Sequence, residues 1–115
     1  RPVRMLDTRN AFEVDAGAFD GATDWRLGRF GEFPAAAAAR AAELAGHTVV
    51  TYCTGGIRCE KAALALQAAG VGPVWQLDGG ILRYLETVGG RHWHGRCVVF
   101  DDRGALDERL VPAPA

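Results

Sequence analysis

Apolar segments of two kinds alternate along this chain: short β-branched runs and longer stretches that are rich in alanine or helically spaced. The short runs predict buried strands, because β-branched and aromatic residues favour the pleated surface of a sheet. These strands are expected at Val3 to Asp7, Thr48 to Tyr52, Val74 to Leu77 and Cys97 to Phe100. The longer stretches predict helices. They are expected at Ala35 to Leu44, Cys59 to Ala69 and Ile81 to Val88.

Proline and glycine residues mark the limits of these elements. Pro34 suits the first turn of a helix, and Gly46 and Gly70 lie just beyond two predicted helix ends. Residues 15–34 show no sustained period and are predicted to be mostly loop. Strands that alternate with helices imply an α/β fold with a central, mostly parallel sheet and helices on both faces. We expect one domain over residues 1–110 and a tail or linker over residues 111–115.

The composition is that of an ordinary globular domain. Of the 115 residues 49% are hydrophobic and 23% are charged, and the formal net charge is -1. This balance gives no bulk attraction to nucleic acid or to an anionic membrane. No apolar run approaches the ~20 residues that a membrane span needs. Three cysteines without framework spacing favour a reducing cytoplasm over structural disulfides.

The candidate reactive residue is Cys53, which directly follows a predicted strand. Gly55 and Gly56 allow a tight turn in which backbone amides converge, and a helix begins at once afterwards. The first N–H groups of that helix and the Arg58 cation, expected at the rim, favour negative charge. These features predict a pKa for Cys53 below the ordinary thiol value of about 8.5. The alternative is a buried structural cysteine beside a simple glycine turn.

The length of the loop separates two reaction classes. Only four residues lie between Cys53 and Arg58, whereas cysteine phosphatases place five residues between their cysteine and arginine. The smaller cradle suits a sulfur atom better than a phosphoryl group. At this point the sequence resembles the rhodanese homology family, which uses a six-residue loop of this pattern.

The resemblance to rhodanese domains covers nearly the whole chain. The segments that carry it are Leu6-Asp7-Thr8-Arg9, Glu13 with Gly17, Gly21-Ala22 and Val74-Trp75-Gln76-Leu77-Asp78-Gly79-Gly80-Ile81. Ala18 and Phe19 replace the family's usual His-Ile, at a position expected to be structural. The family's first strand and helix, ahead of Leu6, are missing, which suggests a truncated or modified domain.

A narrower resemblance is to bacterial tRNA uridine hydroxylases, which modify the wobble uridine in an oxygen-dependent reaction. The matching segments are Cys53-Thr54-Gly55-Gly56-Ile57-Arg58-Cys59-Glu60-Lys61-Ala62, Asp78-Gly79-Gly80-Ile81, Tyr84-Leu85-Glu86, Trp93-His94-Gly95-Arg96-Cys97 and Phe100-Asp101-Asp102-Arg103. In that family the rhodanese domain lies between an N-terminal domain and a cysteine-rich C-terminal part. Contact with tRNA is therefore expected only through regions outside this chain.

Sulfur transfer is the first function that the rhodanese resemblance implies. Cys53 would carry sulfur as a persulfide, taken from a small donor such as thiosulfate or from a protein persulfide, and pass it to a thiol or cyanide-like acceptor. Arg58 would hold anions, and no cofactor or metal is expected. The anion-binding loop is predicted to consist of Thr54, Gly55, Gly56, Ile57 and Cys59. The alternatives are the catalytic core of a tRNA uridine hydroxylase and a non-catalytic interaction module.

Several further residues have both a structural and a functional interpretation. We expect a local ion pair of Arg9 with Glu13 and a turn capped by Asp7, although these residues could instead order the loop. Cys59 could resolve an oxidised Cys53 or simply pack at the helix start. His92, His94 and Cys97 have metal-binding side chains but no evident fourth ligand, so a metal site is not expected. Four arginines could line the mouth of the site: Arg26, Arg29, Arg83 and Arg91.

Overall fold

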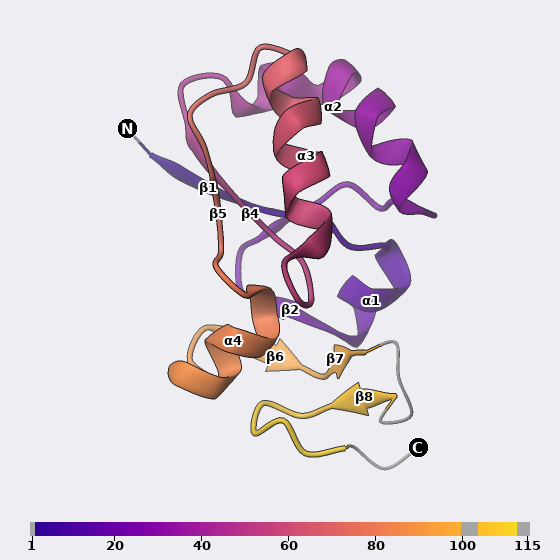
Figure 1. The fold of residues 1–115 in the computed structure, drawn as a ribbon, viewed down its shortest axis with the longest axis vertical. Coiled ribbons are helices and arrows are strands. Elements are labelled where there is room, and N and C mark those ends of the chain that lie inside the picture. The colour runs from indigo at the N-terminus through magenta and orange to yellow at the C-terminus, as the bar shows by residue number, and fades with distance from the viewer. Residues whose placement is uncertain (1, 100–103, 113–115) are drawn as a thin grey trace.

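A four-stranded parallel sheet with the order β3-β1-β4-β5 lies at the centre of the molecule (Figure 1). The computed structural model describes residues 2–99 and 104–112, apart from the side chain of Ile57. The strands of the sheet are β1 (Val3–Asp7), β3 (Thr23–Asp24), β4 (Thr48–Tyr52) and β5 (Val74–Gln76). The expected α/β fold with a mainly parallel sheet is confirmed.

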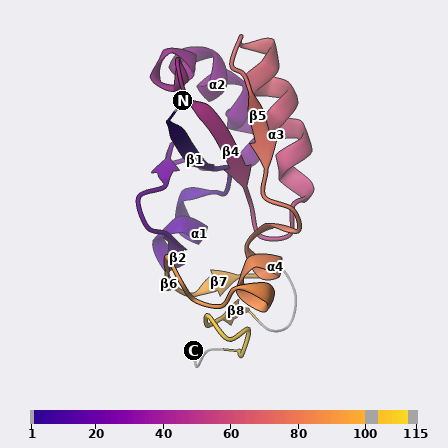
Figure 2. The same cartoon turned by 90° about the vertical axis from the view of Figure 1, so that its left-hand side faces the viewer.

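Two helices pack on one face of this sheet, and a third helix lies at its carboxyl end. On one face α2 (Phe33–Arg40) packs against α3 (Ile57–Ala68), and together they bury Leu6 and Val49 (Figure 2). Pro34 lies in the first turn of α2, and the end of the predicted helix is the 3₁₀ helix η2 (Ala41–Leu44). The α4 helix (Gly80–Thr87) lies beyond the carboxyl end of β4 (Figure 1), and it packs against Tyr52.

Short elements fill much of the region that was predicted to be loop, so that prediction is wrong in part. Residues 15–34 contain the end of α1 (Ala11–Ala16), β2 (Gly17–Phe19), β3, η1 (Phe30–Glu32) and the start of α2. The β2 strand pairs antiparallel with β6 (Trp93–Gly95), more than 70 residues away in the chain. Such pairing leaves no local period in the sequence. Ala18 and Phe19 are buried in it, as the structural interpretation of their position predicts.

The C-terminal part lies beyond the carboxyl ends of β1 and β4, in the lower half of Figure 1. There β7 (Cys97–Val98) forms a two-stranded ribbon with β8 (Ala105–Leu106). The strand ends at Val98, one residue before the predicted Val99, while Phe100 and the turn at residues 101–103 lie outside the described residues. Pro112, at the start of the expected tail, forms a bridge with Leu106. Among the described helices, none has the length and apolar character of a membrane span.

Candidate active site

Cys53 lies at the carboxyl end of β4, where the neighbouring strands of the parallel sheet also end. This is the edge at which α/β sheets carry their reactive groups. The cysteine is followed by a short irregular segment, and α3 begins at Ile57, two residues before the predicted start. Arg58 and Cys59 therefore belong to the first turn of the helix. Only 1% of Cys53 is exposed to solvent.

Three donors surround the Cys53 sulfur. The Cys59 thiol lies 3.7 Å from it and donates toward it, and the backbone N–H of Gly56 donates to it from 3.0 Å. The hydrogen bond from Cys59 has the largest effect on the Cys53 pKa, which it lowers against the opposing effect of burial. The backbone amides of Arg58 and Gly56 and the Arg58 charge lower it further, to about 6. Cys53 is therefore a thiolate at neutral pH.

The loop depends on two glycines that meet across the site. Gly56 precedes α3 with φ of 95°, a left-handed backbone that favours glycine. Gly80, at the start of α4, lies directly against the loop: an added Cβ there would come within 2.5 Å of the Cys53 carbonyl oxygen. The amides of Ile81 and Leu82 donate to the carbonyl oxygens of Cys53 and Thr54 at 2.9 and 3.1 Å. The N-terminus of α4 thus fixes the loop from outside.

Arg58 is held in a bidentate ion pair with Glu13 rather than at the rim of the site. Its two terminal nitrogens lie 2.8 and 2.9 Å from the carboxylate oxygens of Glu13. The Glu13 side chain is fully buried and that of Arg58 is 19% exposed. Burial opposes the charge of Glu13, but the Arg58 hydrogen bonds hold the pKa of this carboxyl below its usual value. The expected position of Arg58 at the rim is thereby corrected.

The predicted pairing of Arg9 with Glu13 is also wrong. The Arg9 guanidinium binds both carboxylate oxygens of Asp7, at 2.7 and 3.0 Å, and donates to the backbone carbonyl of Glu13 at 3.3 Å. Asp7 does cap the turn, as predicted, because it accepts the Arg9 backbone N–H at 3.0 Å. The network joins the end of β1 to α1, and α1 carries the Glu13 carboxylate that holds Arg58. The Asp7–Arg9 pair is thus connected through α1 to the carboxylate that binds Arg58.

The remaining loop residues lie at or beside the entrance of the site. Thr54 is buried, and its hydroxyl donates to the Val98 carbonyl at 3.4 Å. Ile57 begins α3, and its side chain lies outside the described part. A hollow of about 420 Å³ adjoins the loop, lined by Gly55, Gly56, Glu60, Asp78 and Gly79. Its two charged residues, Glu60 and Asp78, are acidic.

None of the four arginines proposed for the mouth is among the residues that line this hollow, although Arg83 lies 4.0 Å from Asp78, which does line it. Arg26 instead pairs with Asp15 and Asp24. Arg29 and Arg91 are not among the residues that line the hollow.

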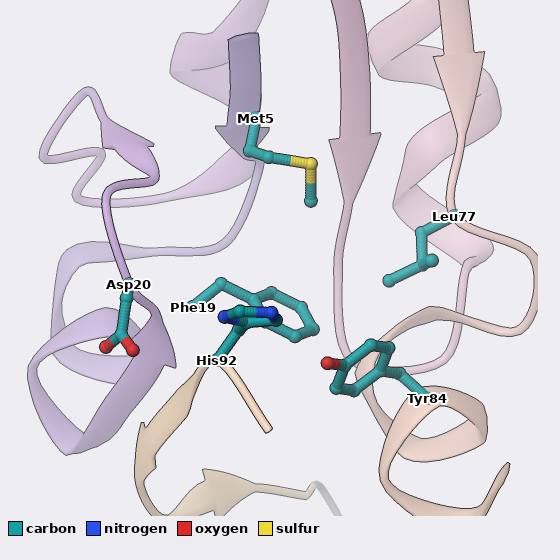
Figure 3. A pocket seen from close by; sticks show the side chains of 6 residues that line it. All are labelled: Met5, Phe19, Asp20, Leu77, Tyr84 and His92. Atoms are coloured by element: carbon teal, nitrogen blue, oxygen red, sulfur yellow. The ribbon is translucent and has the colours of Figure 1, made fainter. Parts of the chain in front are cut away.

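The residues considered for a metal site are dispersed. Cys97 is buried in the core, and Nδ1 of the His94 ring lies 2.8 Å from a carboxylate oxygen of Asp20. His92 lines a separate pocket, shown in Figure 3 with Phe19 and Tyr84 facing the same space. That pocket is mostly apolar and is completed by Met5, Leu77 and Asp20. Within residues 2–99 and 104–112 no group of three His, Cys, Asp or Glu side chains could hold a metal ion.

Comparison with known proteins gives two kinds of similarity. A model of the family described as "Rhodanese-like domain" matches residues 1–87. Over its whole length the chain is 64% identical to a tRNA uridine(34) hydroxylase of Bordetella petrii and covers 46% of that protein. Over 97% of its length it is 61% identical to a protein of the same name from Burkholderia ambifaria, of which it covers 39%. The chain thus spans less than half the length of these curated relatives.

Solved structures share the fold at lower identity. The Rhodanese_3-like domain of an Anabaena protein superimposes with a TM-score of 0.60 at 21% identity, over 76% of this chain and 94% of that one. A Staphylococcus saprophyticus protein does so with a TM-score of 0.58, also at 21% identity, over 73% of this chain and 77% of that one. At this identity the likeness concerns the fold alone.

Proposed function

Because this chain belongs to the rhodanese-like domain family, we propose that it is the thiolate-bearing domain of a tRNA uridine(34) hydroxylase. The observation that carries the proposal is the 64% identity to the Bordetella petrii hydroxylase over all 115 residues. This span includes the Cys53 loop and the residues that support it, Glu13 and Gly80. Both curated relatives carry the hydroxylase name, whereas sulfur transfer is expected from the loop and from the rhodanese resemblance alone.

The geometry supplies the chemical part of this proposal. Cys53 is held as a thiolate by the Cys59 thiol and by the amides of Gly56 and Arg58. A thiolate is the nucleophilic form of cysteine and is also the form that oxidants attack. The domain itself carries a net charge of -1. Contact with the tRNA phosphates, which basic residues dominate, is therefore assigned to the further length that the relatives possess.

A chimeric enzyme tests this function. The matching segment of the Bordetella petrii hydroxylase is replaced by this chain and expressed in a strain without its own hydroxylase. We expect digested tRNA to contain uridine 34 that is heavier by one oxygen atom. Cys53→Ser should abolish that product, and Cys97→Ser should retain it because Cys97 lies in the core. A chimera that is soluble and folded yet yields unmodified tRNA would refute the proposal.

A persulfide carrier is the second candidate, and the depressed pKa of Cys53 supports it. The same donors that stabilise a thiolate would stabilise the terminal sulfur of a persulfide. Incubation of the purified chain with thiosulfate should then add one sulfur atom to Cys53, as seen by intact-protein mass spectrometry. Sulfur addition together with an inactive chimera would favour this candidate over the hydroxylase.

A further inference from the structure

Cys59 is a buried nucleophile for which the function above gives no chemical step. Its side chain is 0% exposed, and its sulfur lies 3.7 Å from that of Cys53. The geometry points to a redox-active dithiol: we propose that small peroxides oxidise Cys53 and that Cys59 closes an intramolecular disulfide with it. The proposal uses the reactive thiolate of Cys53 but does not require tRNA.

The distance and the position of the two cysteines allow this bond. A disulfide has a sulfur–sulfur length of about 2.05 Å, so the two sulfur atoms, now 3.7 Å apart, must approach by about 1.7 Å. Cys53 lies in the irregular segment between β4 and α3, whereas Cys59 is fixed in the first turn of α3. We expect side-chain rotation of the two cysteines, with a small shift of the segment around Gly55, to supply this movement. An added Cβ at Gly55 would meet no atom within 4 Å, which shows that this side of the loop has free space.

The reaction proceeds in two balanced steps. The Cys53 thiolate attacks one oxygen of hydrogen peroxide, the O–O bond breaks, and Cys53 becomes a sulfenic acid while hydroxide leaves and takes up a proton to form water. The Cys59 sulfur then attacks the Cys53 sulfur, loses its proton, and displaces the hydroxyl group as water. The two cysteines together lose two electrons, and the peroxide gains them. Two equivalents of an external thiol return the pair to its reduced state.

The electrostatics of the pair set the order of these steps. While Cys53 is a thiolate, its hydrogen bond with Cys59 and the burial of Cys59 raise the pKa of the Cys59 thiol, so Cys59 keeps its proton. Oxidation of Cys53 to the uncharged sulfenic acid removes the negative charge beside Cys59. The second cysteine thus becomes reactive only after the first has been oxidised.

The entrance suits a small, uncharged oxidant. The hollow beside the loop contains Gly56, whose amide contacts the Cys53 sulfur, and its acidic residues Glu60 and Asp78 do not repel a neutral molecule. Hydrogen peroxide is close to water in size, which matters because Cys53 is almost fully covered.

The test uses the purified, reduced chain and hydrogen peroxide. We expect the wild type to lose two hydrogen atoms by mass, peptide mapping to join Cys53 to Cys59, and dithiothreitol to reverse the change. Cys97→Ser should behave like the wild type. In Cys59→Ser, dimedone should trap a sulfenic acid on Cys53. Of the Cys53 that is oxidised, the share that ends with two added oxygen atoms should be at least about tenfold larger than in the wild type, because no neighbouring thiol is left to close the disulfide.

Wild-type protein alone is sufficient to overturn the proposal. A stable sulfenic acid or a dioxygenated Cys53 without the Cys53–Cys59 bond would refute it, as would a disulfide that joins Cys53 to Cys97 or to a second molecule. Cys59→Ala serves as a second variant if Cys59→Ser fails to fold. Because none of these measurements involves tRNA, a failure here would leave the outcome of the chimera experiment unaffected.

Discussion

Both carboxylate oxygens of Glu13 accept hydrogen bonds from the terminal nitrogens of Arg58, at 2.8 and 2.9 Å, although the two residues are 45 positions apart in the chain. This ion pair anchors the first turn of α3, and with it the amides that face Cys53. Arg58 thus acts on the site mainly from inside the protein. Its charge is balanced by Glu13, while 19% of its side chain remains exposed.

Removal of the Glu13 charge should destabilise the fold. In Glu13→Gln the Arg58 cation loses its buried partner, and loss of one member of such a pair costs about 3 kcal/mol or more in unfolding free energy. Urea denaturation measures this loss. The matched control is Asp15→Asn, which breaks the exposed pair with Arg26 and should cost less than about 1 kcal/mol. Equal losses for both variants would contradict the anchoring function of Glu13.

The reactivity of Cys53 should follow its lowered pKa. We expect the alkylation rate with iodoacetamide to rise with a midpoint near pH 6 and to level off above it, since the thiolate is the reactive form. In Cys59→Ala the largest stabilising hydrogen bond is lost, so the midpoint should move toward the ordinary value of about 8.5. Cys97→Ser should leave it in place. An unchanged midpoint in Cys59→Ala would show that the amides and Arg58 suffice alone.

The same shift makes stability depend on pH. A thiol whose pKa is lower in the folded state stabilises the fold fully above its unfolded pKa and loses this contribution as pH falls through the folded pKa of about 6. Between the two values the slope for one group approaches about 1.4 kcal/mol per pH unit. The difference in unfolding free energy between wild type and Cys53→Ser should therefore grow as pH rises from 6 to about 8.5. A difference that is constant over this range would rule out the depressed pKa.

Gly80 should tolerate no side chain. In Gly80→Ala the added methyl group would meet the Cys53 and Thr54 carbonyl oxygens at 2.5 and 2.7 Å, on a backbone with φ of 65°. The loop must shift to relieve this contact, so alkylation of Cys53 should lose its low midpoint and the fold should lose about 1–3 kcal/mol. Gly31→Ala, where no atom lies within 4 Å, is the control and should behave like the wild type. A normal midpoint in Gly80→Ala would mean that α4 does not shape the loop.

The acidic hollow should discriminate between reagents by charge. Glu60 and Asp78 repel an anion near the entrance, so iodoacetate should alkylate Cys53 more slowly than neutral iodoacetamide. The double variant Glu60→Gln with Asp78→Asn should raise the iodoacetate rate by about two- to tenfold at low salt, with little effect on iodoacetamide. Parallel acceleration of both reagents would instead indicate a wider entrance.

The strands and the reactive cysteine could be predicted from local signals, but the partners of the loop could not. The β-branched run at Thr48 to Tyr52, which predicts the strand, and the glycines that follow Cys53, which predict the turn, are both local patterns of neighbouring residues. The Glu13–Arg58 pair has no such local signal. Either Arg9 or Arg58 could bind the Glu13 carboxylate with both oxygens, and Arg9 is the closer of the two in the sequence. The sequence shows that Cys59 is near Cys53 in the chain, but whether its side chain points toward Cys53 depends on where α3 begins. The start came two residues earlier than the period of the helix indicated.

The position of Gly80 against the loop has a consequence for how the site comes into being. The reactive loop from Cys53 to Cys59 is one short segment of chain. The groups that hold it in place come from distant segments: Glu13, which binds Arg58, and Gly80 to Leu82, which contact the Cys53 and Thr54 carbonyl oxygens. Contacts between such distant parts form late, because the entropy of closing long loops must be overcome first. A synthetic peptide of residues 48–70 would therefore carry the complete motif and still titrate as an ordinary thiol. Reactivity in this protein is a property acquired only when the whole chain has folded.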